Sequence, residues 1–264
     1  MIACTWNKDM ATLFGENIGR MADEMNVSGW YAPSMNTHRS AFAGRNFEYY
    51  SEEGVLAGNM AAAAVKAAKE YGVYGYIKHF ALNDQETVRY GQLCTWASEQ
   101  AIRENYIKPF EIAVKDGGAT AVMSSYNHIG IKPAGACDEL LIGVLRDEWG
   151  FKGMVLSDYF VDFGFMDSDR FIRTGTDCML ADYDTGTNHL TDTESATSIN
   201  AMRNACKNIL YTVVNSRAYA DENIHAGMHK WEKILTGVDV AILICLIAGQ
   251  VVVYRNYKKR TTKA

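Results

Sequence analysis

The stretch that decides the fold is residues 150–160, "GFKGMVLSDYF". Its apolar run, residues 154–156, follows a glycine and is followed in turn by Ser157 and Asp158. A short apolar run between turn-forming residues is typical of a buried strand. A carboxylate at the end of such a strand is costly unless it caps a turn or performs a function. Asp158 is therefore the first candidate functional residue, with a turn cap as the alternative.

Similar apolar runs recur along the chain and alternate with longer helical patterns. Further strands are predicted over residues 27–33, 73–81, 120–127 and 177–181. Helices are predicted over residues 8–24, 52–71, 95–116, 138–149 and 194–216. This alternation indicates an α/β fold with a mostly parallel sheet, and polar residues follow each predicted strand. These polar residues would gather at the carboxyl ends of the strands. A (β/α)8 barrel and an open sheet both bind ligands at that edge, so the pattern does not distinguish the two architectures.

Composition excludes some classes of function. The 264 residues carry a formal net charge of -5, which argues against a nucleic-acid partner because such proteins are usually basic. The six cysteines form no C-x-x-C pair and the six histidines show no metal-ligand spacing, so no metal site is expected. The sequence also lacks the G-x-G-x-x-G and G-x-x-x-x-G-K-[ST] motifs. We therefore expect no cofactor and rank a cofactor-dependent α/β enzyme low.

The C-terminal part has a different character. Residues 234–254 are almost entirely apolar, and at 1.5 Å per residue they span roughly 30 Å, the thickness of a bilayer core. Trp231 precedes them, Tyr254 and Tyr257 lie at their other end, and a basic tail follows. The sequence predicts a transmembrane helix over residues 234–257, and a buried core helix or a pair of strands is the alternative.

The predicted span sets an expected topology. Residues 220–233 would form a linker, and residues 258–264 a basic tail that stays in the cytoplasm by the positive-inside rule. The first 230 residues would then lie outside the cell. We expect a single-pass protein of the cell membrane with an extracellular catalytic domain.

Four motifs follow one another along the chain, and the last of them contains the opening stretch. They read "GRNFEYYSEE" (44–53), "KHFALNDQETVR" (78–89), "VMSSYNHIG" (122–130) and "VLRDEWGFKGMVLSDYF" (144–160). In this order they closely resemble glycoside hydrolase family 3, specifically its β-glucosidase-like members. The resemblance covers about residues 1–217. It implies a (β/α)8 TIM-barrel-like domain over residues 1–219, followed by the transmembrane helix.

The resemblance also implies roles for individual residues. Asp158 matches the family's catalytic nucleophile. The residues that match sugar-binding positions are Arg45, Lys78, His79, Arg89, Met123, Tyr126 and Tyr159. Among these, Tyr159 stands where the family usually has tryptophan, which changes the aromatic wall but keeps a stacking face. The nearby cations, Arg45, Lys78 and Arg89, are expected to keep the Asp158 carboxylate ionised.

Two parts of the family pattern are absent from this sequence. The barrel is expected to lack its first strand, because no "DGP-G-R" segment precedes residue 4. The family's acid/base glutamate lies on an α/β-sandwich domain, which we expect upstream, with Met1 an internal methionine. The expected function is a retaining, β-glucosidase-like hydrolase of β-linked sugars whose acid/base lies outside this chain. The alternative is a non-catalytic carbohydrate-binding surface protein, or an inactive fragment, that retains the barrel pocket.

Overall fold

The computed structural model describes residues 1–161, 164–220 and 230–261. The chain divides into two units, Met1–Asn223 and Ile224–Ala264. The first unit contains the sheet and the helices that pack on it. Helix α7, Lys230–Thr261, makes up the described part of the second unit.

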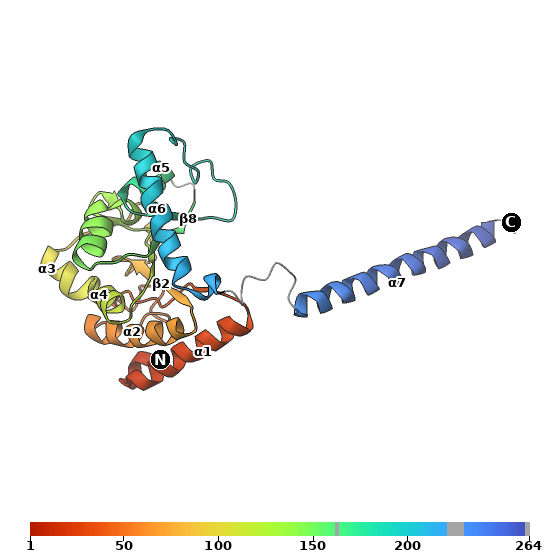
Figure 1. Ribbon diagram of the computed structural model, residues 1–264, viewed down its shortest axis with the longest axis horizontal. Helices are drawn as coiled ribbons and strands as arrows, with labels where there is room; N and C mark the ends of the chain where they lie inside the picture. Colours follow the sequence, from red (N-terminus) through yellow and green to blue (C-terminus); the bar gives the residue numbers. More distant parts are fainter. Residues whose placement is uncertain (162–163, 221–229, 262–264) are drawn as a thin grey trace. The chain divides into compact units, whose positions relative to one another are not determined.

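A curled sheet of five parallel strands forms the centre of the first unit (Figure 1). Its order is β1-β2-β4-β7-β8. The bounds are Gly29–Trp30, Tyr74–Phe80, Ala121–Ser124, Met154–Tyr159 and Cys178–Leu180, in that order. The predicted α/β fold with a parallel sheet is confirmed. Among the described residues the sheet has five strands and ends at β1 and β8, so these residues do not close an eight-stranded barrel.

Helices cover the sheet because the strands alternate apolar side chains between their two faces. Ile77, Val122 and Val155, on the three central strands, lie fully buried in one apolar cluster. The same cluster contains Val65 and Phe110. The helices that flank the sheet are α1 (Lys8–Glu24), α2 (Gly54–Glu70), α4 (Lys108–Lys115), the π-type helix η5 (Glu139–Glu148) and α6 (Ala196–Val214). Each fully buried aliphatic side chain contributes about 1.5–3 kcal/mol to the free energy of unfolding.

One glycine of the opening stretch permits this packing. A Cβ built on Gly153 would lie 1.8 Å from the backbone oxygen of Thr120, which is far inside van der Waals contact. Thr120 and Gly153 immediately precede β4 and β7, which pair in parallel from Ala121 and Met154 onward. Any side chain at residue 153 would therefore push apart the two strands that carry much of the predicted site.

The structure corrects several predicted elements. The helix predicted over residues 95–116 is wrong at its start, because β3 (Cys94–Thr95) pairs with β5 (His128–Ile129) in a small second sheet. That sheet also includes β6, Lys132–Pro133. Helical structure begins only at α3 (Glu99–Ala101), continues through the π-type turn η3 (Ile102–Tyr106) and ends with α4.

The strand predicted over residues 120–127 stops early, at Ser124. The Ser125 hydroxyl and the Asn127 amide both donate to the backbone oxygen of Ala81, at 3.0 and 3.1 Å. These side chains join the loop after β4 to the loop after β2. A short helix, α5 (Ser168–Thr174), and the 3-10 turns η1 (Ile2–Thr5), η2 (Arg89–Gly91), η4 (Ala134–Ala136) and η6 (Arg217–Tyr219) were not predicted.

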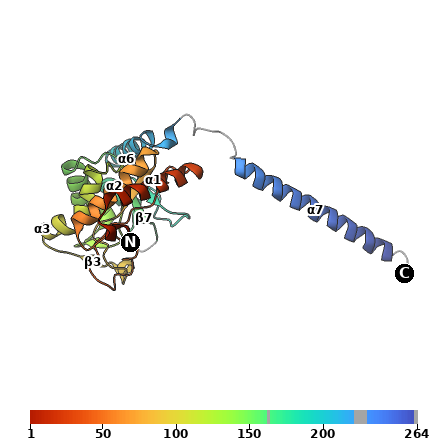
Figure 2. The ribbon, with the colours of Figure 1, turned by 90° about the horizontal axis from the view of Figure 1, so that it is seen from below.

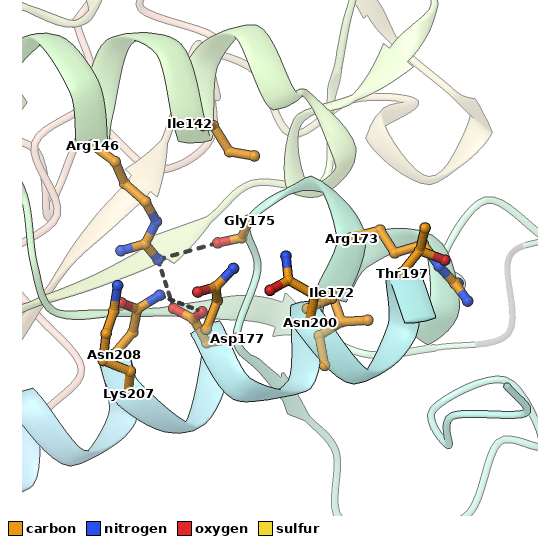
Figure 3. Close-up of a pocket in the computed structure, with 12 residues that line it drawn as sticks. Ile142, Arg146, Ile172, Arg173, Gly175, Asp177, Thr197, Asn200, Lys207 and Asn208 are labelled. Atoms are coloured by element: carbon orange, nitrogen blue, oxygen red, sulfur yellow. Dashed lines mark hydrogen bonds and ion pairs between the residues drawn. The ribbon is translucent and has the colours of Figure 1, made fainter. Parts of the chain in front are cut away.

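A buried carboxylate joins three elements at the amino-terminal end of the sheet (Figure 3). Asp177, just before β8, accepts hydrogen bonds from Arg146 Nη2 at 2.7 Å and from Asn208 Nδ2 at 2.9 Å. It also accepts the backbone N–H of Val155 at 2.7 Å. These residues border a cavity of about 530 Å³. Because each Asp177 oxygen already has partners, and because Asp158 lies at the opposite end of the strands, we assign this cluster a structural role.

Helix α7 is long and apolar enough to cross a membrane by length and composition, over Lys230–Lys258. Its most apolar window has a mean hydropathy of 2.2. The helix begins at Lys230, within the stretch predicted as a linker. The remainder of that linker, residues 221–229, and the end of the predicted tail, residues 262–264, lie outside the described residues.

Candidate active site

Asp158 lies near the carboxyl end of β7 and is almost fully buried, at 8% exposure. The backbone N–H of Tyr159 donates to its Oδ1 at 2.8 Å. Its Oδ2 lies 4.0 Å from Arg89 Nη1, and neither atom has a hydrogen-bond partner among the described residues. A buried carboxylate oxygen with no donor is unusual, because buried polar groups are nearly always paired. The turn-cap alternative accounts for Oδ1 alone, and Oδ2 is left available for a ligand.

Arg89 connects Asp158 to a second carboxylate. Its Nε lies 2.9 Å from Glu86 Oε2. Its guanidinium also stacks over the rings of Tyr90 and Tyr126, with centroid distances of 4.9 and 4.7 Å. The ion pair and the two cation–π contacts hold the guanidinium in place beside Asp158.

The charged network continues away from Asp158 with alternating sign. Glu86 Oε1 lies 3.8 Å from Arg45 Nη1, and Arg45 Nε donates to Glu48 Oε1 at 2.5 Å. Glu48 Oε2 in turn accepts a hydrogen bond from Ser34 Oγ and lies 3.9 Å from Lys78 Nζ. The ends of β2 and β7 and the segments that follow β1 and β2 thus bring the predicted residues Arg45, Lys78 and Arg89 into one cluster with Asp158.

Burial and the neighbouring charges have opposite effects on the pKa of Asp158, and the effect of burial is larger. Desolvation raises the pKa of Asp158, while the Tyr159 amide and the charges of Arg89, Arg45 and Lys78 lower it. The net result is a pKa of about 6, against an ordinary value of 3.8. The three cations thus act in the expected direction, and burial adds a larger opposing effect that the sequence analysis did not consider. Asp158 is ionised at neutral pH, but it titrates about two pH units higher than an exposed aspartate.

Glu48 shows the opposite balance. Burial raises the pKa of Glu48, but hydrogen bonds from Arg45 and Ser34 and the charges of Arg45 and Lys78 outweigh burial and lower the pKa. Burial and the charge of Arg45 lower the pKa of Lys78, partly offset by the charges of Glu48 and Asp158. A carboxylate held in its ionised form makes a poor proton donor. Glu48 is therefore suited to positioning its cationic neighbours.

Lys78 and His79 both belong to the cluster, although adjacent strand residues normally point to opposite faces. The pairing of β2 with β4 shifts register between Ile77 and Phe80, which breaks the alternation at this point. Burial, followed by the charges of Arg45, Lys78 and Arg89, lowers the pKa of His79 well below its ordinary value. His79 is therefore neutral at physiological pH.

Hydrogen bonds with Asn36 fix the position of His79. Its backbone N–H donates to Asn36 Oδ1 at 2.8 Å, and the Asn36 amide donates back to the backbone oxygen of His79 at 2.8 Å. His79 Nδ1 lies 3.3 Å from the same Asn36 oxygen. Asn36 thereby holds both the backbone and the ring of the only predicted histidine of the site.

The remaining predicted residues differ in their surroundings. Tyr126 donates a hydrogen bond from its hydroxyl to the backbone oxygen of Tyr159, which ties the loop after β4 to the end of β7. The Tyr159 hydroxyl donates to Asp182 Oδ1. Met123 is 3% exposed and belongs to an apolar cluster that also contains Met154.

The sequence analysis did not identify Glu86, Ser34 or Asn36 as site residues. Glu86 stands three residues before Arg89 in the "KHFALNDQETVR" motif, a spacing that suits an ion pair and could have identified it. Ser34 and Asn36 had no such signal, because they reach the site through the parallel bridge between Ser34 and Lys78. Nothing in the sequence fixes that register.

Comparison with known proteins identifies the family of this chain. The family model described as the glycosyl hydrolase family 3 N-terminal domain matches residues 1–210. β-Glucosidase A of Butyrivibrio fibrisolvens is 44% identical over 180 residues, which is 68% of this chain and 21% of the relative. β-Glucosidase B of Emericella nidulans is 43% identical over 162 residues, 60% of this chain and 19% of the relative. The chain thus spans about a fifth of the length of these curated relatives.

Solved structures give the same result. β-Glucosidase 3B from Thermotoga neapolitana in complex with α-D-glucose has a TM-score of 0.73 and 35% identity, covering 85% of this chain and 32% of that one. The β-glucosidase of Bifidobacterium adolescentis has a TM-score of 0.77 and 28% identity, covering 86% and 33%. On the match over residues 1–210, this chain belongs to glycosyl hydrolase family 3 and carries its N-terminal domain.

Proposed function

We propose that this chain carries the nucleophile and the sugar-binding residues of a retaining β-glucosidase-like hydrolase. The observation that carries the proposal is the buried Asp158, whose Oδ2 has no hydrogen-bond partner among the described residues and lies beside Arg89. The relatives named as β-glucosidases, and the related structure in complex with glucose, support a β-linked sugar as the substrate.

The chemistry follows from the two carboxyl groups of a retaining glycosidase. Asp158 Oδ2 attacks the anomeric carbon as the bond from that carbon to the leaving oxygen breaks, and the leaving oxygen takes a proton from an acid. Water then attacks the anomeric carbon, the bond to Asp158 breaks, and the water proton passes to the same group acting as base. The β configuration is retained because the carbon is inverted twice.

The neighbouring side chains suit recognition of a sugar ring. Arg45, Lys78 and Arg89 offer hydrogen-bond donors held by carboxylate partners, and neutral His79 offers one ring nitrogen for a hydroxyl. We propose that Tyr126 and Tyr159 supply aromatic surface for the C–H side of the ring and that Met123 lies behind it. Fixed donors of this kind set the orientation of the anomeric carbon over Asp158.

We further propose that the acid/base residue comes from outside this chain, on an α/β-sandwich domain. A retaining enzyme needs its second carboxyl about 5–5.5 Å from the nucleophile and protonated in the first step. Of the carboxylates in the described network, Glu48 is held ionised, and Glu86 is occupied by Arg89 and Arg45. Both act here as counter-ions for cations that would bind sugar.

The first prediction uses a substrate that leaves without acid assistance. We expect 2,4-dinitrophenyl 2-deoxy-2-fluoro-β-glucoside to glycosylate Asp158, because its phenolate needs no proton to depart and the fluorine slows hydrolysis of the adduct. Peptide mass spectrometry should find one added sugar on the peptide that contains Asp158. Asp158→Asn should prevent labelling, whereas Asp184→Asn, an exposed control, should not. Binding of glucose without any adduct would instead favour the non-catalytic alternative.

The second prediction concerns the pH dependence of that reaction. Only ionised Asp158 can attack, so the second-order rate of labelling should be half-maximal near pH 6 and fall about tenfold per pH unit below it. Arg89→Gln removes a positive charge that lowers the pKa of Asp158, so the pH at which labelling is half-maximal should rise. A rate that stays constant down to the ordinary aspartate value of 3.8 would contradict this assignment.

The third prediction concerns stability, with the sign set by linkage. Because folding raises the pKa of Asp158, the folded state loses stability as the pH rises from 3.8 to about 6. At pH 7 the loss of stability is nearly complete and amounts to roughly 3 kcal/mol, whereas at pH 5 only about half of this loss has occurred. Asp158→Asn should therefore raise the free energy of unfolding at pH 7 by about 1–3 kcal/mol, and by less at pH 5. Urea unfolding in detergent measures this, and an equal or lower stability of the variant at pH 7 would refute it.

We also propose that α7 anchors the protein as a single span, with residues 1–220 outside the cell. The fourth prediction tests this orientation in intact cells with a membrane-impermeant maleimide. A variant that keeps only the exposed Cys4 should be labelled directly. A cysteine-free variant carrying Thr262→Cys should be labelled only after permeabilisation. The reverse pattern, or recovery of the chain in the soluble fraction, would exclude the proposed topology.

A further inference from the structure

A second polar pocket lies beside the loop that follows β2. It has a volume of about 160 Å³, the space of about five water molecules at ~30 Å³ each. Its lining includes Arg39, Asp84, Gln85, Cys94 and Trp96. None of the residues assigned above to the active site lines it.

Asp84 is the unusual group in this pocket. It is 7% exposed, and its Oδ1 has no hydrogen-bond partner among the described residues. Burial raises the pKa of Asp84 to about 6, although the Thr37 amide and the charge of Arg39 lower it in part. A carboxyl oxygen buried without a donor costs free energy unless a ligand supplies one. The proposed mechanism gives this group no task.

The neighbouring residue shows that Asp84 faces away from the active site. The Asn83 amide donates to Tyr49 Oη at 3.2 Å and to Glu86 Oε1 at 3.1 Å, so Asn83 belongs to the side of the charged network. Asp84 instead contacts the backbone of Thr37 and faces Arg39. The two adjacent side chains therefore serve opposite sides of one loop.

The other lining groups define the class of ligand. Trp96 is 86% exposed, so one large aromatic face is free beside the pocket. Arg39 and Asp84 carry opposite charges, which disfavours an ion of either sign, and both can hydrogen-bond to hydroxyl groups. A flat apolar face next to paired polar groups matches a pyranose ring, whose C–H face is apolar and whose hydroxyls lie at its rim.

We propose that this pocket is a second sugar-binding site, in which Asp84 Oδ1 accepts a hydrogen bond from a sugar hydroxyl and Trp96 stacks on the ring. The choice of ligand class rests on the proposed function. The ligand is a neutral pyranose, either a free monosaccharide or the distal residue of an oligosaccharide whose other end lies at Asp158.

The fifth prediction uses 5-fluorotryptophan as a label in the full chain, in micelles of a detergent without a sugar headgroup. The five tryptophans give separate ¹⁹F signals, and Trp96→Phe assigns the one of interest. Glucose should shift the Trp96 signal saturably, whereas the signal of exposed Trp6 should stay constant and serve as the internal control. The titration extends to about 100 mM, where a site with a dissociation constant of about 10 mM is nine-tenths occupied.

Variants connect the shift to the pocket. Asp84→Ala should weaken binding about tenfold through loss of a charge-assisted hydrogen bond, and Arg39→Ala should weaken it without affecting folding, because Arg39 is exposed. The other tryptophan signals report whether each variant folds. No saturable shift of the Trp96 signal, or a shift unchanged in both variants, would overturn the proposal.

Arg89→Ala separates this proposal from the proposed function. The glucose-induced Trp96 shift should persist in that variant even if the Asp158 site binds no sugar, and its loss there would refute a separate pocket. Cello-oligosaccharides identify the source of the ligand. If one oligosaccharide spans both sites, Trp96 affinity should rise with chain length and Arg89→Ala should remove the gain. If the ligand is a free monosaccharide, length should make no difference.

Discussion

The opposition between burial and positive charge at Asp158 determines how this site works. Burial at the end of β7 raises the pKa of Asp158 to about 6, and in the proposed mechanism the same burial keeps water from competing for the anomeric carbon. Arg89, Arg45 and Lys78 limit that rise without cancelling it. The group is therefore ionised at neutral pH but has no close ionic partner, which suits the nucleophilic role proposed for it.

The alternation of positive and negative groups explains how six charged side chains can be partly buried together. Three carboxylates, Asp158, Glu86 and Glu48, face the three cations Arg89, Arg45 and Lys78, so the six groups have no net formal charge. Removal of Glu86 or Glu48, which hold their arginines closely, would leave an uncompensated cation, and this costs far more than loss of an exposed pair. Short and long separations alternate along the network, which from Asp158 onward measures 4.0, 2.9, 3.8, 2.5 and 3.9 Å. Glu86 and Glu48 thus each hold one arginine closely, whereas Asp158 has no close ionic partner in the network.

Sequence predicted the parallel sheet because apolar runs such as residues 154–156 depend only on local composition. It also identified Arg45, Lys78, Arg89 and Asp158, which the structure brings together, because the motifs that carry them are short and ordered. It did not identify Ser34 and Asn36, since their approach depends on the pairing of residue 34 with Lys78. It did not anticipate the raised pKa of Asp158, because the cost of burial depends on the three-dimensional packing around the carboxyl. The predicted start of the helix over residues 95–116 was wrong for a similar reason. Strand β3 forms only by pairing with a distant segment, since Cys94 pairs with His128, 34 residues further along the chain.

The zero net charge of the network would affect the ionisation of the acid/base residue that we propose on another domain. A second carboxyl placed about 5–5.5 Å from Asp158 would meet a cluster in which every cation already has an acidic partner. If that carboxyl were ionised, it would add an uncompensated negative charge beside a buried carboxylate, so its protonated form is favoured. The protonated form is what the first step of the retaining mechanism requires. In the proposed mechanism, Glu86 and Glu48 serve as counter-ions for the cations of this domain, so the acid proposed on another domain would be favoured in its protonated form while Asp158 remains the ionised member of the pair.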